Sequence, residues 1–311
     1  MLLDVVNLSK RFKHVQAVKE VNMHIQQGEI IGLLGPNGAG KSTTISMIST
    51  LLKPTGGDVY FNGKSIIKDP KSIRRKLGVV PQEIALYLDL TAEENLQFFG
   101  KINGIKGKKL KSRIEEVLEW IGLAERRKDV VKKFSGGMKR RLNIGVALLH
   151  EPEIIIMDEP TVGIDPQSRN YILETVRRLN QQKGMTVLYT SHYMEEVEYL
   201  CDRIYIMDQG EVIASGTNEE LKDILSSEQT ITIQVERLHK SFIDALIADS
   251  ALKKVDNRDK TVTVIAPKKY PFFKKITGYA EQTETSLVSV EVKAPTLEDV
   301  FLHLTGRALR D

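Results

Sequence analysis

The sequence predicts an α/β domain followed by a small α+β domain, and three observations lead to this prediction. A glycine-rich phosphate-binding motif near the N-terminus stands between an apolar run and a helical pattern. Short apolar runs then alternate with helical patterns up to about residue 225. After the polar residues 226–229 the pattern changes to alternating strands with short helices between them. We therefore expect one domain over residues 1–225 and an accessory domain over residues 226–311.

The composition is that of an ordinary globular protein, and 311 residues are enough for two domains. The net charge of +4 is mild and the basic residues are interspersed with acids, so charge does not argue for a nucleic-acid partner. The single cysteine, Cys201, cannot form a disulfide framework, and we expect it to be a small buried hydrophobe in a reducing cytoplasm. The first residues do not have the pattern of a secretory segment, and no run approaches the ~20 apolar residues that span a bilayer, so we expect any membrane-spanning part to belong to another chain.

The phosphate-binding motif fits G-x-x-x-x-G-K-[ST] without a mismatch. The apolar run 29–34 predicts a buried strand before it, and residues 41–52 predict a helix after it, so a chance glycine-rich turn is disfavoured. Glycine N–H groups and the helix N-terminus favour an anion. Lys41 is expected to reach the β- and γ-phosphates, and the Ser42 hydroxyl to hold Mg²⁺. The residues expected to bind nucleotide here are Gly35, Pro36, Asn37, Gly38, Ala39, Gly40, Lys41, Ser42 and Thr43.

Two strands with one wet face are predicted at residues 2–8 and 15–25, because apolar and polar residues alternate there. Phe12 lies in the turn between them. An aromatic ring at this place could stack on a purine, in the way that aromatic side chains stack on nucleic-acid bases. From the residue alone, a position in the core or at a sheet edge is the simpler interpretation.

The middle of the chain contains a helical insertion that interrupts the α/β alternation. Strands are predicted at residues 59–63 and 77–80, and the second ends just before Gln82. A capping-box pattern starts a helix at Thr91, and residues 108–121 place apolar side chains on one helical face.

Two carboxylates follow the next predicted strand, residues 154–157. The carboxyl ends of parallel strands form the edge at which α/β sheets bind ligands. Asp158 is therefore placed to support Mg²⁺, and Glu159 to orient or deprotonate a water molecule. The alternative is a turn or helix cap, which a phosphate-binding motif in the same chain disfavours.

Further polar residues close the predicted α/β domain. A helix is expected to start after Asp165 and to end near Gln182, and a strand follows over residues 185–191. His192 comes directly after that strand, at the same sheet edge as Glu159, where a donor to a γ-phosphate would stand. A lone histidine is usually structural, which is the alternative for this position. A hairpin over residues 202–215 and a short helix complete the domain.

The accessory domain has the predicted order β-α-β-β-α-β with a further helix, which indicates a ferredoxin-like fold. It shows no catalytic pattern. The basic pair Lys268 and Lys269 stands beside the aromatic residues Tyr270, Phe272 and Phe273 and could dock a partner. Core packing explains the aromatic residues more simply.

The order of these motifs resembles that of the ATP-binding-cassette (ABC) ATPases over roughly residues 2–225. The resemblance implies that Phe12 is the aromatic residue that stacks on adenine. It implies that Gln82 is the loop glutamine that touches Mg²⁺ or water and senses a membrane partner. Ser135, Gly136 and Gly137 match the signature loop, which contacts the γ-phosphate held by the opposite subunit. On its own, Ser-Gly-Gly before a helix is a weak signal.

The resemblance also implies roles for the carboxylates and the histidine. Glu159 matches the general base, Asp165 the loop that joins two sites, and His192 the γ-phosphate switch. One departure is present, because the signature usually ends in Gln and position 138 is Met. This departure affects only a side-chain contact from position 138. The Ser135 hydroxyl and the glycine N–H groups, which the resemblance implies face the phosphate, are still present.

Residues 138–141, Met-Lys-Arg-Arg, and the tail 294–306 resemble the drug-resistance branch of ABC exporters, which includes the daunorubicin and linearmycin resistance types. This implies ATP and Mg²⁺ as cofactors, a head-to-tail dimer of cassettes, and separate integral membrane permease subunits. It also implies export of a lipophilic antibiotic or similar compound, with the chain bound peripherally at the cytoplasmic face of the cell membrane.

Two other functions remain as alternatives. A soluble ABC ATPase that acts on DNA or ribosomes tends to carry long coiled coils, zinc modules or two cassettes. This chain has one phosphate-binding motif, one cysteine and no extended heptads, which disfavours that class. A nucleotide-dependent switch without transport is left open by the sequence.

Overall fold

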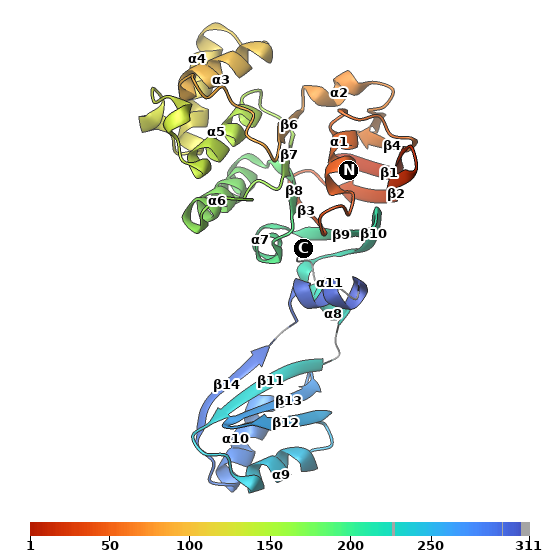
Figure 1. Cartoon of the computed structure of the whole chain (residues 1–311), viewed down its shortest axis with the longest axis vertical. Helices are drawn as coiled ribbons and strands as arrows, with labels where there is room; N and C mark the ends of the chain where they lie inside the picture. Colours follow the sequence, from red (N-terminus) through yellow and green to blue (C-terminus); the bar gives the residue numbers. More distant parts are fainter. Residues whose placement is uncertain (226–227, 294, 306–311) are drawn as a thin grey trace. The chain divides into compact units, whose positions relative to one another are not determined.

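The computed structural model describes residues 1–225, 228–293 and 295–305, and these form two compact units. The first unit is Met1–Asn218 and the second begins at Glu219 (Figure 1). Part of the predicted joint, residues 226–227, lies outside the described residues, as do residue 294 and the end of the chain from residue 306. Among the residues that the structure describes, no helix has the length and apolar composition of a bilayer-spanning segment.

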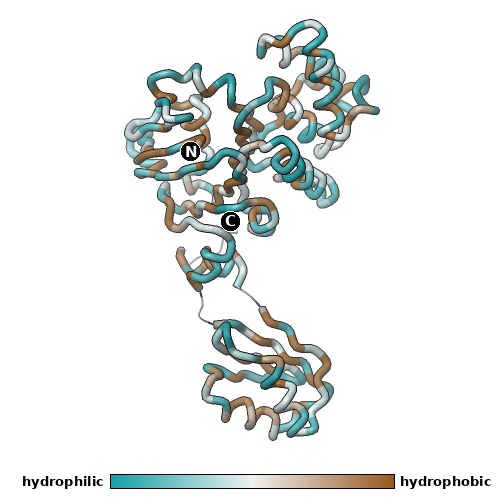
Figure 2. The backbone as a smooth tube through the Cα atoms, turned by 180° about the vertical axis from the view of Figure 1, so that it is seen from behind, coloured by the Kyte–Doolittle hydropathy of each residue, from teal (hydrophilic) through white to brown (hydrophobic). Residues whose placement is uncertain are grey.

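A six-stranded sheet forms the centre of the first unit, in the order β10-β9-β3-β8-β7-β6. The strands from β9 to β6 are parallel, and β10 pairs with β9 as an antiparallel hairpin. Every residue of β3 and β8 is buried, as expected for parallel strands covered on both faces. The hydropathy colouring in Figure 2 shows hydrophobic segments, in brown, in the interior of this unit. The strands are β3 (Ile30–Leu34), β6 (Leu77–Val80), β7 (Ile154–Asp158), β8 (Thr186–Ser191), β9 (Arg203–Asp208) and β10 (Glu211–Gly216).

An antiparallel sheet in the order β2-β1-β4-β5 packs against the same hydrophobic core. The first helix, α1 (Lys41–Ile48), contributes Ile45 and Ile48 to that core. The predicted helix over 41–52 is too long, because Thr50 adopts a left-handed conformation with φ 61°. The strands are β1 (Leu3–Phe12), β2 (Val15–Ile25), β4 (Gly56–Phe61) and β5 (Lys64–Ser65).

The helical insertion lies on the other side of the central sheet (Figure 1). The predicted capping box at its start is confirmed, because Glu94 N–H donates to Thr91 Oγ1 at 3.2 Å and Thr91 N–H donates to Glu94 Oε2 at 2.8 Å. Two helices, α2 and α7, were not predicted. The helices are α2 (Pro70–Arg74), α3 (Ala92–Ile102), α4 (Gly107–Trp120), α5 (Gly136–Leu148), α6 (Pro166–Lys183) and α7 (Met194–Leu200), with short 3₁₀ turns at Ala124–Arg126 and Val131–Lys133.

The second unit confirms the predicted β-α-β-β-α-β order. Its antiparallel sheet runs β12-β13-β11-β14, and its core joins sheet residues to Phe242, Leu246 and Ile276 of the two helices. Its elements are β11 (Glu228–Val235), α9 (Lys240–Ala248), β12 (Lys254–Arg258), β13 (Thr261–Pro267), α10 (Phe272–Gln282), β14 (Leu287–Lys293) and α11 (Leu297–Thr305); α8 (Asn218–Asp223) lies at the boundary of the two units.

Asp249 connects the two helices that cover this second sheet. It follows α9, and its Oδ2 accepts hydrogen bonds from the hydroxyls of Tyr279 at 2.6 Å and Tyr270 at 2.7 Å. The Nζ of Lys275 lies 3.4 Å away, and Ala251 N–H donates to Oδ1 at 3.0 Å. The hydrogen bonds from Tyr279 and Tyr270 hold the pKa of the Asp249 carboxyl well below its usual range.

We expect Asp249→Asn to destabilise the second unit by about 1–2 kcal/mol at pH 7, because the carboxylate accepts charge-assisted hydrogen bonds. The folded pKa lies below the unfolded value of about 3.9, so this contribution is fully present above about pH 4 and is lost as the pH falls toward the folded pKa. Urea unfolding of the full chain at pH 7 and pH 3, read by hydrogen exchange of peptides within residues 228–293, measures it.

The matched control is Asp244→Asn, which changes an exposed aspartate on α9. Equal stability of the two variants at pH 7 would contradict a stabilising role for Asp249. A deficit of Asp249→Asn that does not shrink at low pH would show that its carboxylate charge is not the cause.

Candidate nucleotide-binding site

The phosphate-binding loop connects the end of β3 to the start of α1 and allows no side chain at Gly40. Gly40 has φ 103°, and a Cβ there would lie 2.6 Å from the Ala17 carbonyl oxygen. Lys41 begins the helix and is 5% exposed. Its Nζ donates to the carbonyls of Gly35 at 2.7 Å and Pro36 at 3.1 Å, so the ammonium lies inside the loop. This loop and helix start form an anion-binding cradle.

Oxygen ligands suitable for Mg²⁺ gather where β7 ends. The Ser42 hydroxyl donates to Asp158 Oδ1 at 3.5 Å, across 116 residues of sequence. Thr190 Oγ1 donates to the same carboxylate oxygen at 2.8 Å and fixes its direction. Hydroxyl and carboxylate oxygens are the ligands that Mg²⁺ prefers, so the residues present fit this ion.

The Glu159 carboxylate is the point at which four motifs meet. It is 6% exposed; Lys41 Nζ lies 3.3 Å and His192 Nδ1 3.4 Å from its Oε1, and Gln82 Nε2 donates to its Oε2 at 3.1 Å. Glu159 adopts φ 45°, a left-handed conformation that costs roughly 1–2 kcal/mol for a residue with a Cβ. Its N–H donates to Thr190 Oγ1 at 2.9 Å, which helps to hold that conformation.

Phe12 lies apart from this cluster, at the end of β1. Its side chain is 45% exposed, and Lys10 Nζ lies 5.1 Å from the ring centroid. The core interpretation of Phe12 is therefore wrong.

Cys201 is buried as expected, and burial raises the pKa of its thiol.

The N-terminus of α5 is formed by Ser135, Gly136 and Gly137. These residues make no hydrogen bond to the phosphate-binding loop in the described structure. Ser135 is exposed and caps the helix, because its Oγ accepts from Met138 N–H at 3.2 Å. A Cβ at Gly137 would lie 2.1 Å from Ser168 Oγ, so this glycine lets α5 pack closely on α6. Within the described chain, no hydrogen bond connects residues 135–137 to residues 35–43.

Asp165 caps α6 beside that helix start. Its Oδ1 accepts from Ser168 N–H at 2.9 Å, and this hydrogen bond lowers the pKa of the Asp165 carboxyl. At position 138, where the family signature usually has Gln, the backbone N–H of Met138 forms the hydrogen bond that caps α5. This bond does not involve the methionine side chain.

The sequence did not reveal Glu196, a carboxylate of α7 that is 3% exposed. Its Oε2 accepts hydrogen bonds from the hydroxyls of Thr161 at 2.7 Å, Tyr189 at 2.8 Å and Ser191 at 3.2 Å. Thr161 follows Glu159 by two residues and Ser191 directly precedes His192, so Glu196 connects the two segments. No motif could have identified it, because its partners come from separate elements.

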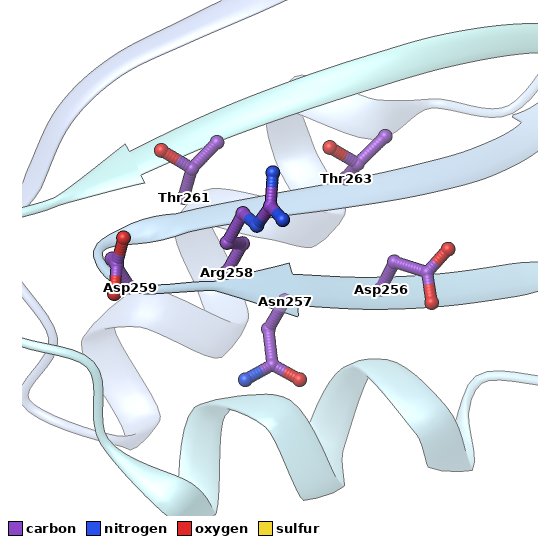
Figure 3. Close-up of a pocket in the computed structure, with 6 residues that line it drawn as sticks. All are labelled: Asp256, Asn257, Arg258, Asp259, Thr261 and Thr263. Atoms are coloured by element: carbon purple, nitrogen blue, oxygen red, sulfur yellow. The ribbon is translucent and has the colours of Figure 1, made fainter.

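A shallow polar pocket lies on the β12–β13 hairpin of the second unit (Figure 3). None of its residues belongs to the phosphate-binding or carboxylate motifs. The residues that line it are Asp256, Asn257, Arg258, Asp259, Thr261 and Thr263.

Comparison with known proteins agrees with this geometry. The sequence model of the family described as ABC transporter matches residues 18–162. The linearmycin resistance ATP-binding protein LnrL of Bacillus subtilis is 49% identical over 312 residues, which cover 100% of both chains. The daunorubicin/doxorubicin resistance ATP-binding protein DrrA of Streptomyces peucetius is 34% identical, over 99% of this chain and 94% of its own.

Solved structures match most of the chain. A dimeric post-hydrolysis state of an ATP-binding cassette, bound to ADP and Pi, superposes with a TM-score of 0.63 at 30% identity. The match covers 70% of this chain and 98% of that one. The chain belongs to the ABC transporter family, as an ATP-binding and ATP-hydrolysing subunit.

Proposed function

We propose that this ATPase powers export of a lipophilic antibiotic or similar compound through separate membrane permease subunits. The names of the full-length relatives, which concern resistance to linearmycin and to daunorubicin, support this cargo class. The chain would bind peripherally at the cytoplasmic face of the cell membrane. The observation that carries the ATPase mechanism is the Glu159 carboxylate, which lies against residues from three other motifs.

Each copy supplies the groups that bind Mg-ATP. Lys41 and the N–H groups at the start of α1 would hold the β- and γ-phosphates, and Phe12 would stack on the adenine. Ser42, Asp158 and Gln82 would hold Mg²⁺, which neutralises phosphate charge when bound. The hydrogen bonds from Ser42 to Asp158 and from Gln82 to Glu159 support the assignments around Mg²⁺, and Phe12 lies apart from these groups.

Glu159 would act as the general base. Lys41 Nζ and His192 Nδ1 both lie within 3.4 Å of Glu159 Oε1. A bound γ-phosphate would therefore compete with the Glu159 carboxylate for these two side chains. The freed carboxylate accepts a proton from a water molecule, which attacks the γ-phosphorus while ADP leaves. Gln82 donates to the other carboxylate oxygen, so it would orient Glu159 during this step.

The complete site would need a second copy, arranged head to tail. Ser135 and Gly136 are exposed at a helix N-terminus, and no hydrogen bond of the described residues joins them to their own phosphate-binding loop. Such a terminus suits a phosphate held by another chain. ATP then favours the closed dimer, and loss of the γ-phosphate reopens it.

An exposed aromatic surface beside the Gln82 loop is the proposed contact for the permease. We call it the aromatic patch, and its members are Tyr87, Leu88, Phe98 and Ile102, with exposed fractions of 38–65%. The rings of Tyr87 and Phe98 pack edge to face, with their centroids 4.7 Å apart. Contiguous exposed apolar side chains of this kind mark interaction sites.

Glu159→Gln should retain ATP binding but lower turnover by about 10²–10⁴-fold, the usual contribution of a general base. It should accumulate as an ATP-bound dimer, because the γ-phosphate persists. Steady-state ATPase assays and size-exclusion chromatography with Mg-ATP measure both effects. The control is Glu119→Gln, an exposed glutamate of α4. Near-normal turnover of Glu159→Gln would refute the base assignment, and a monomeric ATP-bound form would refute the dimer.

Phe12→Ala should weaken ATP binding by about 1–3 kcal/mol, the scale of base stacking on an aromatic ring. Leu51→Ala is the control, because Leu51 is also apolar and exposed, at 78%. Titration with ATP of each variant, in the Glu159→Gln background to prevent hydrolysis, gives the two affinities. Equal affinities would exclude stacking by Phe12.

Phe98→Ala should reduce co-purification with multi-span membrane proteins from detergent-solubilised membranes several-fold, while the ATPase of the isolated chain is preserved. The loss of apolar contact area at the aromatic patch is the reason. Tyr199→Ala, an exposed aromatic residue of α7, is the control. If the unmodified chain co-purifies with no membrane protein, the transport proposal fails and a nucleotide switch is favoured.

A further inference from the structure

Arg140, on the first turns of α5, is a buried cation with no carboxylate beside it. It is 3% exposed, and no acidic group of the described residues forms an ion pair with it. Burial lowers the pKa of its guanidinium, and its Nε has no hydrogen-bond partner in the described structure. A buried charge without an ionic partner is costly, so an apolar side chain would fill this place at lower cost.

The guanidinium is used instead to hold two neighbouring backbone carbonyls. Nη1 donates to the Pro81 carbonyl at 2.6 Å, and Nη2 donates to the Gln82 carbonyl. The planar fork of arginine can hold two acceptors in a fixed geometry, which a lysine cannot. Asn143, one helical turn later and also buried, accepts from Ala85 N–H at 3.4 Å. The helix α5 therefore holds the loop 81–85 at both ends.

This loop carries the side chain that meets the catalytic carboxylate. Gln82 Nε2 donates to Glu159 Oε2 at 3.1 Å, although the Gln82 side chain is otherwise exposed. An exposed side chain keeps one direction only if its backbone is fixed. Arg140 fixes the backbone at Gln82 through its hydrogen bonds to the Pro81 and Gln82 carbonyls. Ser135 caps the same helix, so a shift of α5 would be transmitted to Gln82.

We infer that Arg140 is a positioning residue for ATP hydrolysis, which holds Gln82 against Glu159 and ties that contact to the helix that Ser135 caps. This inference rests on the proposed roles of Gln82 and Glu159. It goes beyond them because it gives a role in hydrolysis to Arg140, to which the resemblance to the family assigned none. Through Arg140, the helix that begins at the surface offered to a second copy is linked to the chain's own hydrolytic centre.

A double-mutant cycle on the purified full chain tests the inference. Arg140→Lys keeps the charge but loses the fork, so we expect kcat to fall roughly tenfold with KM for ATP unchanged. Gln82→Ala should lower kcat as well. The double variant should be no slower than Gln82→Ala alone, because Arg140 acts through Gln82. Arg140→Met, which removes both donors, should lower kcat further and provides a second measurement.

Arg141→Lys is the matched control. Arg141 also lies on α5 and donates to carbonyls, but to those of Ile121 at 3.1 Å and Gly122 at 3.3 Å, far from the loop. Arg141→Lys and Gln82→Ala should therefore act independently. The factor by which the double variant lowers kcat should equal the product of the factors of the two single variants.

The outcomes separate the two proposals. Near-normal turnover of Arg140→Lys, or independent effects of Arg140→Lys and Gln82→Ala, would overturn the inference alone. A raised KM with unchanged kcat would also overturn it. Near-normal turnover of both Glu159→Gln and Gln82→Ala would instead refute the proposed mechanism, and the inference with it.

Discussion

The contact between the Lys41 ammonium and the Glu159 carboxylate is the interaction on which the site depends. Both groups are almost fully buried and lie 3.3 Å apart. Either charge alone would be costly in this interior, so each stabilises the other and the two loops that carry them. The left-handed backbone at Glu159, φ 45°, persists because the surrounding contacts hold it. A phosphate that competes for Lys41 therefore changes the surroundings of Glu159 directly.

The parallel sheet explains why residues far apart in sequence share this place. The strands β3, β8, β7 and β6 are neighbours, and all run in one direction. Their carboxyl ends lie at one edge, followed by the phosphate-binding loop, His192, Glu159 and Gln82 in that spatial order. Strand order, rather than sequence order, brings the four motifs together.

Residues with no expected role in nucleotide binding or hydrolysis hold the site residues in place. The buried carboxylate of Glu196 joins hydroxyls on both sides of the site, and Thr190 fixes the Asp158 carboxylate and the Glu159 backbone. Arg140 holds the loop that carries Gln82. Mutation of such residues disturbs geometry without removing a reacting group, so their effects depend on the motif residue that each one positions.

Hydrophobic periodicity, the capping box at Thr91 and the motif spacings are local signals that can be read from the residues alone. They predicted the strand–helix order of the second unit and, apart from the short helices α2 and α7, the main elements of the first. The fold was needed to show that Phe12 is exposed, that the Glu159 backbone is left-handed, and that Arg140 and Glu196 form buried hydrogen bonds to residues from other elements. The reason is physical: burial and long-range hydrogen bonds depend on which strands and helices become neighbours, and no local pattern records that.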